Sequence, residues 1–318
     1  MRAQPLVSVA MIAYNHRPFI AQALASVLAQ RCDFAFEIVI SDDRSPDGTA
    51  SVIDDFQRQH PDIIRRLDPP KNVGMHVNFN RVWQACTGKY IAILEGDDFW
   101  NEPTKLQQQA AFLEAHPEVT VSGHSVWWCD EQGTVNGRFP EEAAAIPIVC
   151  DGSRLFHQGN YLQTCGVMVR RGVVPVVPEW IAKLGYVDYP LLLLHGFRGS
   201  VGFEDRPDAT YRRHVNSIWT PKTALFKQLQ HYRMLCEMSR LSDSVVGTFA
   251  ADIRQHRDES AAGLFDEAHW HRKQGNCDQA WRIYRELLRE KVTRRVLLAA
   301  MKNAVVWANP FRVRQGAA

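Results

Sequence analysis

Short apolar runs alternate with segments of helical periodicity over the first 96 residues, and this pattern constrains the fold more than any other feature of the chain. Four runs, LVSVAMIA, FEIVISD, IIRRL and YIAILEG, predict buried strands at 6–13, 36–42, 63–67 and 90–96. Apolar residues at helical spacing lie between them at 17–30, 48–59 and 75–86. Strands that alternate with helices of about 10–15 residues indicate βαβ units. We therefore expect an α/β fold with a mostly parallel sheet flanked by helices.

The second part of the chain has a different pattern. Beyond about residue 221 the alternation gives way to long amphipathic stretches, and no proline occurs between Pro221 and Pro310. We therefore expect two regions, an α/β domain at 1–220 and an α-helical region at 221–318.

The helical region contains one repeat-like hairpin and a basic tail. Residues 261–291 resemble a tetratricopeptide-type hairpin, with Gly275 at its turn and Ala280 as a small packing residue. One such unit is fewer than the roughly three that an independent repeat domain needs, so it is expected to pack on the α/β domain or, in a homodimer, on a second copy. The tail at 291–314 is basic and amphipathic. Two alternatives stay open for it, peripheral contact with an anionic membrane and burial against the hairpin.

Composition and short motifs exclude several classes of protein. A formal net charge of +2 gives no general attraction to nucleic acid. No apolar run reaches the roughly 18 residues that a transmembrane helix requires, and the first residues lack the pattern of a signal peptide. The seven cysteines are scattered without a CxxC pair, which predicts free thiols in a reducing compartment. We therefore expect a soluble cytoplasmic protein that binds no nucleic acid.

Polar side chains gather where three of the predicted strands end. The first strand leads into Ala13, Tyr14 and Asn15, the second into Asp42 and Asp43, and the fourth into Asp97 and Asp98. Ligands of open α/β sheets bind outside the carboxyl ends of the strands, so we expect these three clusters to form one site. Asp47, which precedes Gly48 and Thr49, is instead expected to cap the second helix.

The residue types at this edge favour a divalent cation and a diphosphate. Adjacent carboxylates such as Asp97 and Asp98 repel each other unless a positive partner lies beside them. The sequence contains neither a P-loop nor a G-x-G-x-x-G fingerprint, so a bound phosphate needs another counter-charge. Mg²⁺ or Mn²⁺ held by carboxylate oxygen atoms supplies that charge. The pattern therefore indicates a metal site that binds a nucleoside diphosphate.

Several blocks of the sequence, in order along the chain, resemble one known family. They are VSVAMIAYNHRPFIAQALASVLAQ, FEIVISDDRSPDGT, NVGMHVNFNRVWQACTGKYIAILEGDDFWNEPTKLQQQAAFLEAHPE and YRRH. They are similar to the family 2 glycosyltransferases with the GT-A fold, mainly over residues 6–128, and EGDDFW followed by KLQQQ is similar to a bacterial branch that acts on cell-surface glycans. The resemblance implies an inverting transfer of a sugar from a nucleotide-sugar donor, with UDP expected, to a glycan or lipid-linked acceptor. It also implies Mn²⁺ or Mg²⁺ as the cofactor.

The resemblance implies roles for residues that contact the donor. The base is expected to contact Ala13, Tyr14, Asn15 and Asp43, the ribose Asp97, and the metal Asp98. Many members have an Arg-Asn pair in the helix after N-x-G, where this chain has Phe79 and Asn80. Asn80 is therefore expected to contact the nucleotide, and Arg44 and Arg81 are the candidates to replace the missing arginine.

The resemblance implies further roles in the second half of the α/β domain. In YRRH, His214 is expected to bind the metal or the diphosphate, and Arg212 or Arg213 to neutralise phosphate charge. Asp188 matches the Asp of the family's Glu-Asp segment, which is the usual catalytic base, although Val187 replaces the Glu. Asp188 would then deprotonate the acceptor hydroxyl. The alternative is that Asp188 only caps the helix that follows it.

Two other functions stay open at this stage. A nucleotidyltransferase that makes sugar nucleotides would share the layout and the metal-binding carboxylates, but it would normally have a Gly-rich loop after the first strand. A non-catalytic protein of the same fold would serve as a scaffold through its helical region.

Overall fold

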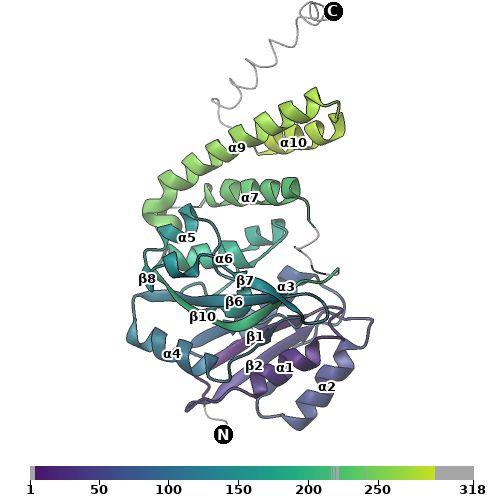
Figure 1. Cartoon of the computed structure of the whole chain (residues 1–318), viewed down its shortest axis with the longest axis vertical. Helices are drawn as coiled ribbons and strands as arrows, with labels where there is room; N and C mark the ends of the chain where they lie inside the picture. The colour runs from purple at the N-terminus through teal and green to yellow at the C-terminus, as the bar shows by residue number, and fades with distance from the viewer. Residues whose placement is uncertain (1–3, 216, 218, 220–221, 242, 291–318) are drawn as a thin grey trace, which may run out of the picture. The chain divides into compact units, whose positions relative to one another are not determined.

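A computed structural model describes residues 4–215, 217, 219, 222–241 and 243–290 (Figure 1). The chain divides into two compact units, residues 1–221 and 222–318. The strands of the first unit are β1 (Val7–Ala13), β2 (Phe36–Asp42), β3 (Ile64–Arg66), β4 (Tyr90–Ile93), β5 (Phe99–Trp100), β6 (Val119–Cys129), β7 (Val135–Phe139), β8 (Val149–Cys150), β9 (Met168–Arg170) and β10 (Ser200–Arg212). Its helices are α1 (Ile20–Leu28), α2 (Thr49–Gln59), α3 (Met75–Ala85), α4 (Lys105–Ala115), α5 (Ser153–His157) and α6 (Asp188–Gly196), with short 3-10 helices η1 (Ala143–Ala145), η2 (Thr164–Gly166) and η3 (Glu179–Lys183).

One mixed sheet organises the first unit. Its strand order is β3-β2-β1-β4-β9-β6-β10-β5, with β7 paired to β6 and β8 paired to β10. The first four strands pair in parallel, which confirms the prediction from the alternating pattern. Beyond β4 the short strand β9 runs antiparallel to both of its neighbours, and β5, β7 and β8 add further antiparallel pairs. The sheet therefore places the carboxyl ends of β1, β2 and β4 at one edge.

The helices cover the two faces of the parallel strands. Apolar side chains of α1, α2 and α4 form one buried cluster with alternate residues of β1, including Val7, Val9 and Met11. Helix α3 contacts β1 and β2, and its buried residues lie outside that cluster. Figure 1 shows α3 on the side of the sheet away from α1 and α2. Since side chains of a strand alternate between faces, β1 is apolar on both of them.

The second unit is helical in its described residues. Its elements are α7 (Ala224–Met238), α8 (Asp243–Val246), η4 (Gly247–Phe249), α9 (Ala250–Lys273) and α10 (Cys277–Arg289). The predicted hairpin is present: Gly275 takes a left-handed φ of 79° in its turn, and Ala280 is buried against α9. The first helix of the hairpin is longer than predicted, because it begins at Ala250. The basic tail at 291–314 lies outside the described residues, and with it the predicted membrane contact.

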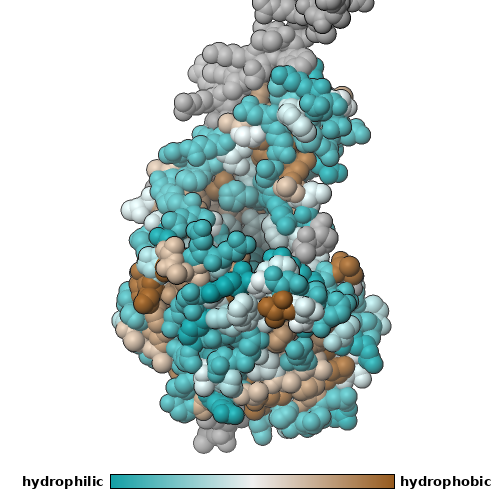
Figure 2. Space-filling model, viewed as in Figure 1, coloured by the Kyte–Doolittle hydropathy of each residue, from teal (hydrophilic) through white to brown (hydrophobic). Residues whose placement is uncertain are grey.

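The described surface and helices bear on contact with a membrane. Figure 2 shows a face on which hydrophilic residues predominate and hydrophobic side chains form small, separate groups. Among the described residues, no helix combines the length and the apolar composition needed to cross a bilayer.

Candidate functional site

The loop after β1 is fixed to the loop after β2 by backbone-to-side-chain hydrogen bonds. Asn15, which has a left-handed φ of 58°, donates its backbone NH to Ser45 Oγ (2.9 Å), and His16 N donates to Thr49 Oγ1 (3.0 Å). Asp47 Oδ1 accepts from Thr49 N (2.9 Å), the first residue of α2, although the N-cap position itself is Gly48 and not Asp47 as predicted. These contacts hold the tight turn that carries the His16 side chain toward the sheet edge.

Two of the residues predicted to contact the nucleobase lie at adjacent strand ends. Asp43 N donates to Ala13 O (2.9 Å), which continues the β1–β2 pairing past the last paired residues. The two carboxylate oxygens of Asp43 accept from Val73 N and Gly74 N, each at 2.8 Å, so this side chain also fixes the start of α3. Tyr14, which follows Ala13, is 46% exposed, whereas Asp43 is 3% exposed. Tyr14 is therefore the accessible member of this pair.

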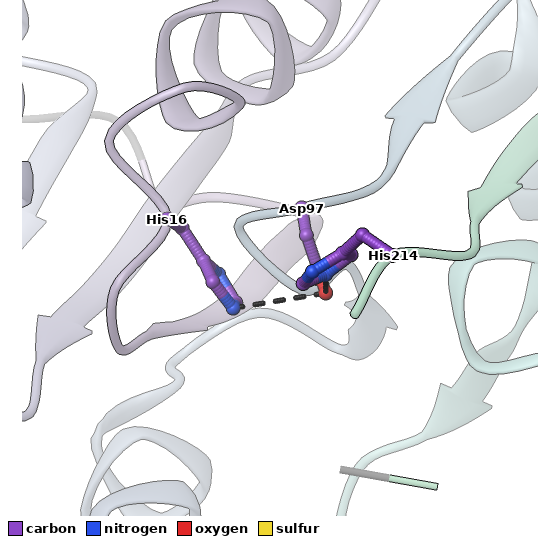
Figure 3. A group of neighbouring side chains, drawn as sticks. All are labelled: His16, Asp97 and His214. Carbon is purple, nitrogen blue, oxygen red and sulfur yellow. Dashed lines mark hydrogen bonds and ion pairs between the residues drawn. The ribbon is translucent and has the colours of Figure 1, made fainter. Parts of the chain in front are cut away.

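His16, Asp97 and His214 converge on one point from three separate segments (Figure 3). Asp97 Oδ2 lies 2.9 Å from His214 Nε2 and 3.6 Å from His16 Nε2. The three potential ligand atoms lie within 4.8 Å of one another. A carboxylate with two imidazoles suits a divalent transition metal such as Mn²⁺.

The surroundings of this group fit a bound cation. All three side chains are mostly buried, and the Nδ1 atoms of His16 and His214 have no hydrogen-bond partner among the described residues. Burial opposes ionisation of Asp97, yet the nearby His16 and His214 lower the pKa of this carboxyl below its usual value. An ionised carboxylate between two imidazoles is the state that binds a metal.

The imidazole of His16 depends on a glycine. A Cβ atom at Gly96 would lie 2.9 Å from His16 Nδ1 and 2.9 Å from Ile20 Cδ1, distances that real Cβ atoms essentially never show. Glycine at this position therefore leaves the space that the ring occupies. His16 was not among the predicted ligands, although its place directly after Asn15, beyond the end of β1, was a usable indication.

Asp98 has a different environment from Asp97. It is buried, its Oδ1 accepts from Arg212 N (2.8 Å), and it lies outside the group of potential metal ligands. Burial, followed by the charges of Asp97 and Glu95, raises the pKa of Asp98 well above its usual value. The opposite pKa shifts relieve the repulsion between the two adjacent aspartates, because they favour an ionised Asp97 and a protonated Asp98. Asp98 was predicted to bind the metal and Asp97 to contact the ribose. In the structure it is Asp97, and not Asp98, that lies with His16 and His214.

Arg212 and Arg213 point into different surroundings. Arg212 is buried, with its guanidinium 4.8 Å from the ring centre of Phe19 and 5.3 Å from that of Phe99. Its side chain donates to three segments: Nε to Asp97 O (3.1 Å), Nη1 to Glu131 O (3.1 Å) and Nη2 to Gln22 Oε1 (2.7 Å). Arg213 is exposed, and its guanidinium stacks 3.9 Å from the ring centre of Trp128. Arg212 therefore holds three segments of the site together, whereas Arg213 is accessible to a phosphate.

This difference predicts opposite effects of two alanine substitutions. Arg212→Ala should destabilise the chain by about 2–4 kcal/mol, because it removes a buried side chain that packs on two rings and donates to Asp97 O, Glu131 O and Gln22. Arg213→Ala should change the free energy of unfolding by less than about 0.5 kcal/mol and weaken UDP binding. Urea unfolding and calorimetry with UDP measure the two effects, and equal stability of the two variants would contradict the assignment.

Asp188 is the first residue of α6. It is partly buried, and burial raises its pKa, while the backbone NH of Tyr189 lowers it. Val187 occupies the N-cap position, and no side chain caps this end of α6. The charge of Asp188 also contributes, after burial and Asp97, to raising the pKa of Glu95 to about 8. Asp188 therefore lies near Glu95. Glu95 belongs to the segment after β4 that also carries Asp97, the candidate metal ligand.

Asn80 has partners away from these groups. Its Oδ1 accepts from Gln84 Nε2 (3.0 Å) on the same helix and from Val177 N (3.3 Å) in the connection before α6. It lines a groove of about 650 Å³ between α3 and residues 177–182. The contact of Asn80 with the nucleotide stays a prediction.

Arg44 and Arg81 were the candidates to replace the missing arginine, and each donates a hydrogen bond to a backbone carbonyl of this chain. Arg44 Nε donates to Pro69 O (2.6 Å), and Arg81 Nη2 donates to Leu67 O (2.9 Å). Both arginines thus bind the segment that follows β3.

Comparison with protein-family models shows the family to which the chain belongs. Residues 8–171, more than half of the chain, match the model of Glycosyl transferase family 2. The chain belongs to this family. The matched residues include His16, Asp43 and Asp97, and they end before Asp188 and His214.

Relatives of this family member include proteins with and without a described activity. The uncharacterized protein Rv1520 of Mycobacterium tuberculosis is 34% identical over 67% of this chain, which matches 60% of the relative's length. The Escherichia coli protein WfaP, a UDP-Glc:alpha-D-GlcNAc-diphosphoundecaprenol beta-1,3-glucosyltransferase, is 26% identical over 73% of this chain and 90% of its own length.

Two solved structures show the same GT-A fold. The structure of S. aureus TarS 1–349 in complex with UDP matches with a TM-score of 0.56 and 17% identity, over 82% of this chain and 72% of TarS. The mannosyltransferase PcManGT from Pyrobaculum calidifontis, in complex with GDP-Man and Mn²⁺, matches with a TM-score of 0.55 and 16% identity, over 97% of this chain and 82% of its own. At these identities the likeness shows the fold alone.

Proposed function

We propose that this protein transfers a sugar, with inversion, from a UDP-sugar to a hydroxyl group of a glycan or lipid-linked acceptor. The observation that carries the proposal is the convergence of His16, Asp97 and His214 at the sheet edge, with Asp188 near the same segment. A group that can hold a cation beside a partly buried carboxyl provides both requirements of the reaction: stabilisation of the departing diphosphate and a base for the acceptor.

The identity of the donor and the acceptor is supported by similar proteins. WfaP is named for a UDP-glucose donor and a diphosphoundecaprenol acceptor, and TarS has been solved with UDP and with UDP-GlcNAc. PcManGT instead binds GDP-Man, so the fold by itself accepts more than one nucleotide. In this chain Tyr14 and Asp43, with Ala13 and Asn15 beside them, are proposed to bind the base.

His16, Asp97 and His214 are proposed to hold Mn²⁺ or Mg²⁺, with the mixed nitrogen and oxygen ligands favouring Mn²⁺. When bound, this cation supplies a Lewis acid that neutralises charge on the diphosphate. Asp97 thus takes the metal role in place of Asp98, because the carboxylate of Asp98 accepts from Arg212 N inside the protein. Arg213 is proposed to add a positive charge at the exposed side of the diphosphate.

Asp188 is proposed to accept the proton of the attacking hydroxyl. A pKa raised by burial makes this carboxylate a stronger base than an exposed aspartate, which favours proton transfer from an alcohol. The proposed base comes from α6, and the proposed metal ligands come from the segments that follow β1, β4 and β10. Inversion requires the hydroxyl to attack from the face opposite to the diphosphate.

A donor-hydrolysis screen on the full chain tests the proposal. Purified protein is incubated with UDP-glucose, UDP-N-acetylglucosamine and GDP-mannose, in Mn²⁺ and in EDTA, and the released nucleoside diphosphate is measured. We expect release from a UDP-sugar in Mn²⁺ and at least a tenfold lower rate in EDTA. Release that is equal in EDTA would contradict the metal assignment. Binding of UDP without release from any donor, and without transfer to added acceptors, would instead support a non-catalytic scaffold.

A further inference from the structure

One face of α3 holds the connection between β9 and α6 through hydrogen bonds to its backbone. Trp83 Nε1 donates to Val174 O (2.9 Å), and Asn80 Oδ1 accepts from Val177 N (3.3 Å). His76 Nε2 lies 2.7 Å from Leu184 O. Positions 76, 80 and 83 follow the spacing of a single helical face. The connection is therefore fixed to α3 at successive turns of that helix.

These bonds matter because the connection has little regular structure. Between β9 and α6 it contains the short η3 helix (Glu179–Lys183), so its backbone groups need partners outside a ladder or a long helix. Leu184, whose carbonyl contacts His76, lies four residues before Asp188. The place where α6 begins, and hence the place of its first side chain, follows from where Leu184 is held.

We propose that His76 is a positioning residue for Asp188, through its hydrogen bond to the carbonyl of Leu184. The inference rests on the proposed function, in which Asp188 is the general base. A carbonyl oxygen only accepts, so Nε2 of His76 carries the hydrogen atom. Nδ1 is buried and has no hydrogen-bond partner among the described residues. Burial lowers the pKa of His76, which is consistent with a neutral ring in this position.

The start of α3, where His76 lies, also bears on the nucleotide side of the site. Val73 N and Gly74 N, directly before α3, donate to the carboxylate of Asp43. One helix thus contacts both the residue proposed to bind the nucleobase and the segment that carries the proposed base. A fixed helix of this kind keeps the donor and the general base in register, and an error of about 1 Å in such a register costs up to 10²-fold in rate.

Two substitutions at His76 separate positioning from simple loss of packing. His76→Leu keeps a side chain of similar size but makes it apolar, and so removes the donor to Leu184. His76→Gln retains an NH at about the place of Nε2 and should rescue the bond. Val77→Ala is the matched control, since Val77 lines the same groove on α3 but is 51% exposed. Thermal unfolding of all three variants reports whether they fold.

Steady-state transfer and calorimetry with UDP and Mn²⁺ give the first readout. We expect His76→Leu to lower kcat by about tenfold or more with the Kd of UDP unchanged, and His76→Gln and Val77→Ala to stay within about threefold of wild type. Equal losses in the Leu and Gln variants, or a Leu variant as active as wild type, would overturn the proposal.

Hydrogen exchange gives a second readout that does not depend on activity. Backbone amides at 185–192 should exchange faster in His76→Leu than in wild type, and at the wild-type rate in His76→Gln. Unchanged exchange in His76→Leu would refute the anchoring itself. If the wild-type protein performs no transfer but His76→Leu still exchanges faster than wild type, the proposed function is refuted and the anchoring stands. The two failures are therefore distinguishable.

Discussion

Asp188→Asn is expected to lower the turnover number of sugar transfer by about 10²–10⁴-fold, the range that a positioned general base contributes. Asn is similar to Asp in shape but cannot take a proton from the acceptor hydroxyl at neutral pH. Asp188, the first residue of α6, is not one of the potential ligands His16, Asp97 and His214, so the affinity for UDP in Mn²⁺ should change little. Initial rates with saturating donor, together with calorimetry, measure both quantities.

Glu179→Gln provides the matched control for this experiment. Glu179 is an exposed carboxylate in η3 of the same connection, and its neutralisation should leave the turnover number within about twofold. If Asp188→Asn retains full turnover, Asp188 is not the base and its role reduces to the start of α6. A variant that loses UDP binding along with turnover would instead indicate a contact of Asp188 with the donor.

Asp97→Asn is expected to abolish the part of UDP affinity that depends on Mn²⁺ and to lower turnover by about 10²-fold or more. A metal acting as a Lewis acid contributes several kcal/mol to the transition state, and each 1.36 kcal/mol corresponds to a factor of ten in rate. Neutralising the carboxylate that lies between His16 and His214 removes the anionic member of the ligand group. Titrations of UDP with and without Mn²⁺ give the metal-dependent part directly.

The same substitution at the adjacent residue is the control. Asp98→Asn retains an oxygen atom that accepts from Arg212 N, so the metal dependence of UDP binding should be preserved. This pair of variants separates the structural assignment from the one implied by the sequence. Loss of the metal dependence in Asp98→Asn, together with its retention in Asp97→Asn, would return the ligand role to Asp98.

The parallel strands and their helices could be predicted from the sequence, because each of these elements has its own pattern of apolar residues over a short stretch of the chain. Apolar runs such as Val7–Ala13 are buried on both faces, and the helices between them have their own periodicity. The rest of the sheet was not predictable in the same way. Strands as short as Phe99–Trp100 and Val149–Cys150 have no period of their own, and they exist only because β10 offers a partner.

The structure brings predicted residues together at the expected edge of the sheet, but their arrangement there differs from the predicted one. Which of two adjacent aspartates faces a ligand depends on the turn that follows Ile93, the end of β4, and on the position of β10 beside it. The same holds for Arg212 and Arg213, whose surroundings are opposite although they are neighbours. His16 was missed for a related reason: its partners lie far away in the sequence, and only the folded chain brings them together.

The separation of His16, Asp97 and His214 along the chain has a consequence for how the proposed metal site forms during folding. His214 follows Asp97 by 117 residues and lies just after β10, which pairs with β6 in the far half of the sheet. Contacts of such long range form late in folding, because the entropy of closing the intervening loop must first be overcome. A cation held by all three residues would therefore bind only a chain in which β10 has paired with β6, and metal binding would report that the α/β unit is complete.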